Sequence, residues 1–113
     1  MGGISTHVLD TARGAPAGGV PVTLETAGMS TCDVLARALT DPNGRVQALL
    51  PEGHRLEAGL YRLTFDTSAY FRAHNVDAFF PEVTILFEIR DASQHYHVPL
   101  LLSPFGYSTY RGS

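Results

Sequence analysis

Imidazole side chains recur on two alternating stretches of this chain of 113 residues. His95 and His97 are separated by one residue, so in a β-strand their side chains lie on the same face. His7 lies in the stretch Ile4 to Asp10, on the face that is not simply apolar. Because histidine titrates near neutral pH, imidazoles grouped in this way could transfer protons. The alternative for His7 is a partly exposed strand histidine with no chemical role.

A guanidinium follows a well-defined turn. Asp41-Pro42-Asn43-Gly44 combines a proline that fixes φ with an Asn-Gly pair that readily adopts left-handed conformations. Arg45 comes next, at the start of a short strand predicted to reach Leu49. A guanidinium on a rigid turn can present paired donors to a planar, carbonyl-rich ligand. A solvated arginine at a strand start is the alternative.

The last twenty residues predict a strand, a corner at Ser103-Pro104-Phe105-Gly106 and a second strand that continues to Ser113. Gly112 lets the backbone approach a neighbour closely, and Arg111 can anchor the segment by pairing with a carboxylate or carbonyls. Ser113 would then direct its hydroxyl and α-carboxylate at the histidines and favour the protonated imidazole. These features suggest that the C-terminal residues belong to a site.

The same histidines could in principle bind zinc. A His-x-His pair on a strand places two imidazoles on one face, and zinc accepts such ligands. A catalytic zinc site also needs a third fixed ligand and supporting residues, and no Asp or Glu lies at a suitable spacing. We therefore expect no metal and no other cofactor.

The elements that must position these residues are short strands. About eight alternating stretches, with turn signals every 8–12 residues or so, predict an all-β sandwich. One brief helix is expected from Ala69 to His74, with Thr67 and Ser68 at its N-cap and Asn75 closing it.

Composition limits the functional classes. The length predicts one domain over residues 1–113, and 44% hydrophobic with 17% charged residues is a globular composition. A net charge of −3 with no lysine argues against nucleic acid or an anionic membrane surface as a partner. The single cysteine, Cys32, is expected to be a small buried residue and cannot form an internal disulfide. No apolar run approaches the length of a membrane span, so a cytoplasmic location is expected.

Taken together, the motifs are similar to those of a known family. The terminal Tyr110-Arg111-Gly112-Ser113, with His97 upstream, resembles the 5-hydroxyisourate hydrolases, the transthyretin-related enzymes of purine catabolism. Asn43-Gly44-Arg45 resembles the family segment that supplies an arginine to the active site, and Phe79 to Val83 resembles a strand entry. Leu9 to Leu24 resembles the opening of transthyretin-like proteins in general. Transthyretin itself resembles the rest of the chain but lacks the terminal tetrapeptide.

The resemblance implies a transthyretin-like, eight-stranded β-sandwich with one short helix. It implies cofactor-free hydrolysis of 5-hydroxyisourate to 2-oxo-4-hydroxy-4-carboxy-5-ureidoimidazoline, during urate degradation. The small purine-derived substrate would be bound in a homotetramer, a dimer of dimers, with sites in a channel between the dimers. The catalytic residues implied are His7, Arg45, His97 and Ser113, and the substrate-binding residues are Tyr110, Arg111, Gly112 and His95.

Two other classes remain open on the residues alone. A small-molecule carrier would use the same channel for aromatic ligands without turnover, although paired histidines and a polar tail do not favour it. A structural module of the prealbumin type would explain the sandwich, but it would not need the histidines, the arginine and the tail together.

Overall fold

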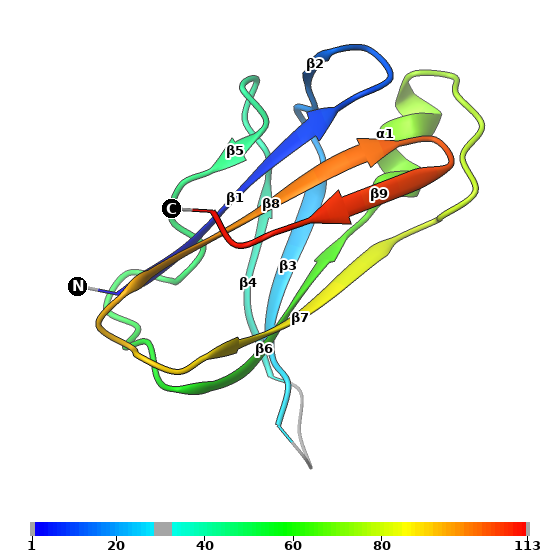
Figure 1. Ribbon diagram of the computed structural model, residues 1–113. Helices are drawn as coiled ribbons and strands as arrows, with labels where there is room; N and C mark the ends of the chain where they lie inside the picture. The colour runs from blue at the N-terminus through cyan, green and yellow to red at the C-terminus, as the bar shows by residue number, and fades with distance from the viewer. Residues whose placement is uncertain (1, 29–32, 113) are drawn as a thin grey trace.

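Two β-sheets packed face to face form the structure (Figure 1). The computed structural model describes residues 2–28 and 33–112. The first sheet contains β1 (Gly3–Asp10), β2 (Ala15–Pro16), β5 (Arg45–Val46), β8 (His95–Ser103) and β9 (Gly106–Thr109). The second contains β3 (Pro21–Thr26), β4 (Val34–Leu39), β6 (Gly59–Phe65) and β7 (Val83–Ile89). Their orders are β2-β1-β8-β9, with β5 also paired to β1, and β4-β3-β6-β7.

The all-β sandwich predicted from the alternating stretches is confirmed. The part of the chain that the structure describes has nine strands where about eight were expected. The difference is small because β2 and β5 are two residues long, and each pairs with β1 over two residues. They extend the first sheet beside β1, where β5 positions Arg45.

The core lies between the sheets and takes the inward side chains of each strand. In β1, Ile4 and Val8 are fully buried, while alternation places Ser5 and His7 on the outer face. In β8, Tyr96, Val98, Leu100 and Leu102 are buried toward the core. The predicted common face of His95 and His97 is therefore the outer face of the first sheet.

The pairing between β1 and β8 decides which outward residues meet. These two strands run parallel and in register over all of β1. Gly3 lies opposite His95 and Ser5 lies opposite His97. This parallel pairing joins two segments from opposite ends of the chain, and strand periodicity alone did not predict it.

The single predicted helix is present, but its N-terminal cap differs from the expectation. Helix α1 spans Thr67–Ala73, and the Asp66 side chain caps it by accepting a hydrogen bond from the Ala69 N–H at 3.0 Å. Thr67 and Ser68 are therefore inside the helix, because the carboxylate one residue earlier satisfies the free N–H groups of the first turn. Asn75, with φ of 55°, closes the helix as predicted.

The last strand is shorter than predicted. β9 ends at Thr109, where its regular pairing with β8 stops, although the tail stays beside β8 in the same antiparallel register. Gly112 makes an isolated antiparallel bridge with His97. Ser113 and Cys32, for which roles or burial were predicted, lie outside the described residues. In residues 2–28 and 33–112, no helix has the length and apolar character needed to cross a membrane.

Candidate active site

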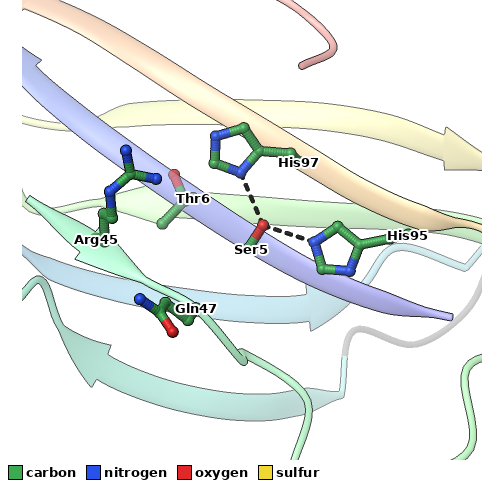
Figure 2. Close-up of a pocket in the computed structure, with 6 residues that line it drawn as sticks. All are labelled: Ser5, Thr6, Arg45, Gln47, His95 and His97. Atoms are coloured by element: carbon green, nitrogen blue, oxygen red, sulfur yellow. Dashed lines mark hydrogen bonds between the residues drawn. The ribbon is translucent and has the colours of Figure 1, made fainter. Parts of the chain in front are cut away.

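A serine hydroxyl joins the two outward histidines of β8. Ser5 Oγ lies 2.8 Å from Nε2 of His95 and 2.7 Å from Nδ1 of His97 (Figure 2). Ser5 is only 8% exposed, and both hydrogen bonds are partly buried. The His97 ring thus has Nδ1 occupied, which leaves Nε2 as the nitrogen available to a substrate.

Arg45 is positioned by the predicted turn. The Asp41 side chain accepts hydrogen bonds from the N–H groups of Asn43 and Arg45, both at 2.9 Å. Gly44 has a φ of 77°, and a Cβ there would lie 2.3 Å from the Val8 carbonyl oxygen, so only glycine fits. The turn is therefore packed against β1, and β5 ends at Val46, earlier than the predicted Leu49.

His7 lies beside Arg45, since the two residues are paired between β1 and β5. The His7 Nε2 lies 2.9 Å from the carbonyl oxygen of Asn43. A carbonyl oxygen can only accept, so Nε2 carries a proton and donates it. This hydrogen bond leaves Nδ1 as the free nitrogen of His7.

An open cavity of about 300 Å³ lies on the outer face of the sheet. Its lining residues, drawn in Figure 2, are Ser5, Thr6, Arg45, Gln47, His95 and His97. Arg45 and Gln47 come from β5 and the segment after it, while the histidines come from β8 on the other side of β1. His7 borders this group through Arg45 but does not line the cavity itself.

The electrostatics of the cavity favour a neutral imidazole. Partial burial lowers the pKa of His97 below its ordinary value, because burial disfavours the charged ring. The positive charge of Arg45, followed by His7 and His95, lowers the pKa of His97 further. The predicted opposite influence, from the carboxylate of Ser113, lies outside the described residues. A neutral His97 can accept a proton near neutral pH.

Gly112 packs closely against the imidazole ring of His97. Its N–H donates to the His97 carbonyl oxygen at 2.8 Å. A Cβ at this position would lie 2.6 Å from Cδ2 of the imidazole ring, so the close approach requires glycine. The tail is thus part of the packing that fixes the His97 ring, as the sequence suggested for Gly112.

Tyr110 and Arg111 lie elsewhere. The Arg111 guanidinium stacks 4.4 Å from the centre of the Tyr96 ring and donates to the Gln94 side-chain oxygen at 2.9 Å. With Tyr96 and Val98, both residues line a second cavity, about 310 Å³ in volume. Because Tyr96 and Val98 face the core side of β8, this cavity is separate from the one that holds His97. Arg111 is anchored by a side-chain carbonyl, in line with the expected carboxylate or carbonyls, and also by an aromatic ring that was not expected.

Sequence reasoning gave no role to Ser5, Thr6 or Gln47, three of the six residues that line the cavity. Ser5 carried a usable signal, because it alternates with His7 and so shares the outer face. Gln47 carried none, since it follows β5 in an irregular segment. Among the described residues, no group of three or more His, Cys, Asp or Glu side chains is arranged to hold a metal ion.

The fold is that of the transthyretins. Sea bream transthyretin, solved in complex with thyroxine, matches with a TM-score of 0.88 at 31% identity, over 96% of this chain and 93% of that one. The 5-hydroxyisourate hydrolase of Klebsiella pneumoniae matches with a TM-score of 0.86 at 40% identity, over 98% and 99% of the two chains. A probable 5-hydroxyisourate hydrolase of Caenorhabditis elegans is 49% identical over 97% of this chain and 81% of that protein. The model of the HIUase/transthyretin family matches residues 4–112, and the chain belongs to this family.

Proposed function

We propose that this protein hydrolyses 5-hydroxyisourate, opening its six-membered ring at an amide bond during urate degradation. The observation that carries the proposal is the convergence on one open cavity of the His97 imidazole, whose pKa is lowered by burial and by Arg45, and of the Arg45 guanidinium itself. Both relatives named as hydrolases are more similar in sequence than the transthyretin, which favours turnover over ligand carriage. A structural module would have no need for this cavity.

The reaction needs a base for water, a polarised carbonyl and a proton for the departing nitrogen. In our scheme His97 Nε2 takes a proton from water while the water oxygen bonds to the substrate carbonyl carbon. Arg45 donates to the carbonyl oxygen, where negative charge develops. The carbon–nitrogen bond then breaks, and the nitrogen leaves with a proton returned by Nε2. His7, with its Nε2–H held by Asn43, offers Nδ1 to orient the water or the ring.

The remaining proposed roles are those of the C-terminal tail. The contact between Gly112 and His97 supports a positioning role for the tail. Participation of Ser113 in catalysis, and substrate binding by Tyr110 and Arg111, stay predictions from the family resemblance. In a single chain, Arg111 anchors the tail to Tyr96.

The direct test follows the ultraviolet absorbance of freshly generated 5-hydroxyisourate with and without the protein. The substrate also decays by itself, so the informative quantity is the rate above that background. We expect decay proportional to protein concentration, and a residual rate at least 10²-fold lower for His97→Asn, the scale of a positioned base. Decay at the background rate with folded wild-type protein would refute the proposed function.

We further infer that four copies assemble and that the protein acts in the cytoplasm. In one chain the cavity lies open on a sheet face, where water weakens the electrostatic interactions that the scheme uses. A second copy over this face would limit water access and complete a channel. Light scattering should give a tetramer, and a fully active monomer at assay concentration would contradict the inference.

A further inference from the structure

A single hydroxyl group lies between two imidazoles and limits which of their ring nitrogens can lack a hydrogen. Ser5 has a single hydrogen to donate and bonds both His97 Nδ1 and His95 Nε2, at 2.7 and 2.8 Å. The two facing nitrogens cannot both be bare, because the hydroxyl could then satisfy only one of them. The protonation of one ring is thus linked to that of the other.

The chemistry of a base fixes the direction of this chain. If His97 Nε2 is to accept a proton, the neutral ring must hold its hydrogen on Nδ1. Nδ1–H then donates to Ser5 Oγ. His95 Nε2 is the remaining hydrogen-bond partner of this hydroxyl, so the serine hydrogen is donated there. His95 therefore holds its own hydrogen on Nδ1, near Gly3, where only a hydrogen atom occupies the Cβ position.

We propose that Ser5 is a positioning residue that makes His97, Ser5 and His95 a proton relay for the proposed hydrolysis. When Nε2 of His97 takes the proton from water, Nδ1 passes its proton to Ser5 Oγ, which passes its own to His95 Nε2. His97 ends neutral with its hydrogen on Nε2, and His95 ends as the imidazolium. Transfer in the opposite sense follows when Nε2 protonates the departing nitrogen, so both rings and the hydroxyl return to their starting state.

The environments of the two rings favour this movement of charge. His97 is half-buried with the guanidinium of Arg45 nearby, and this setting disfavours a positive ring. His95 lies opposite Gly3 of β1, further from Arg45 and its partner His7 than His97, which lies opposite Ser5. A positive charge on His95 therefore meets less repulsion from Arg45. The relay thus moves the transient positive charge away from Arg45, whose own charge is needed at the substrate carbonyl. This assigns to His95 a role different from the substrate binding predicted from the sequence.

This inference rests on the proposed function, and two measurements distinguish a failure of the relay from a failure of the proposed function. Nitrogen-15 spectra of labelled histidine report which ring nitrogen carries the hydrogen, independently of any substrate. We expect His97 with its hydrogen on Nδ1 in the wild type, and loss of that preference in Ser5→Ala. A wild-type His97 with its hydrogen on Nε2 would overturn the proposal even if the enzyme is active. Absence of turnover in the wild type would instead refute the proposed function.

Kinetics test the relay itself through a double-mutant cycle. Ser5→Ala should lower kcat by about 10²-fold, while Ser5→Thr, which keeps the hydroxyl, should recover most of the rate. His95→Asn should cause a similar loss, and adding Ser5→Ala to it should cost little more, because one pathway has already been broken. Ser103→Ala removes a hydroxyl from the same sheet, bonded to Gly106, and serves as the matched control. Losses that multiply in the double variant would overturn the relay, and the wild-type spectra decide the matter if Ser5→Ala does not fold.

Discussion

Replacing Gly112 with alanine tests whether the tail fixes the catalytic ring. The new Cβ would lie 2.6 Å from Cδ2 of His97. Two carbon atoms in favourable contact are about 3.5–4.0 Å apart, so the ring or the tail must move by roughly 1 Å. The ring is also tied through Nδ1 to Ser5 at 2.7 Å, and a shift of this size breaks that hydrogen bond.

The expected effect is much larger on turnover than on stability. A misplacement of about 1 Å at a reacting group costs on the order of 10²-fold, equal to about 2.7 kcal/mol of transition-state stabilisation. The folded state loses at most one hydrogen bond, from the Gly112 N–H, worth about 1 kcal/mol and a few degrees in Tm. We therefore expect kcat/KM in the ultraviolet assay to fall about 10²-fold while the thermal melt remains cooperative.

A second glycine of the same hairpin provides the control. An added Cβ at Gly106 would meet nothing closer than Ser103 Oγ at 3.8 Å, so Gly106→Ala should keep wild-type kcat/KM. If Gly112→Ala folds and also hydrolyses the substrate at the full rate, the ring tolerates displacement. Gly112 would then not be a positioning residue for His97.

The remaining predictions concern the proposed roles. His7→Asn, Arg45→Ala and His97→Asn should each lower kcat by about 10²-fold or more, whereas His54→Asn should be near wild type in the same assay. Because the pKa of His97 is lowered, the base stays neutral below the ordinary value of about 6.5, and activity should fall only when the pH passes the lowered pKa. Arg45→Ala removes a positive neighbour, so the acid limb of its kcat/KM profile should move to higher pH. Exhaustive treatment with EDTA should leave activity intact, and a loss that zinc restores would contradict the metal-free scheme. Deleting residues 111–113 should abolish most turnover with little change in Tm, since it removes the contacts behind His97 but no strand of either sheet.

The sequence predicted which face each histidine occupies but not which residues lie next to it. A period of two assigns His95 and His97 to one face, and the Asp41 turn follows from its own residue chemistry. The neighbour across a strand depends on which strands pair and in which register, and these are decided by packing over the whole chain. The parallel pairing that brings Ser5 to His97 could therefore not be predicted from the sequence. The interruption of the β8–β9 pairing after Thr109 was also missed, because β9 was expected to continue to Ser113.

The helix cap and the aromatic partner of Arg111 were missed for a different reason, because several chemically suitable partners were available. Asp66 and Thr67 are both good capping residues, and a sequence does not say which carboxylate or hydroxyl the first turn will select. Arg111 was expected to pair with a carboxylate or carbonyls, and it bonds the side-chain carbonyl of Gln94. Its stacking on an aromatic ring was not predicted, although a guanidinium also stacks well on such rings. Tyr96 is the ring that the fold supplies.

The parallel contact between β1 and β8 has a consequence for how activity appears during folding. Ser5 and His97 are 92 residues apart in the sequence, so the loop between them must close before the site exists. Pairings between such distant segments carry a large entropic cost and form slowly compared with local hairpins. The hairpin of β8 and β9 is local in the sequence, but without β1 its histidines lack their hydroxyl partner. Regain of hydrolysis after dilution from denaturant would therefore report the docking of β8 on β1, and a partly folded chain should have no partial activity.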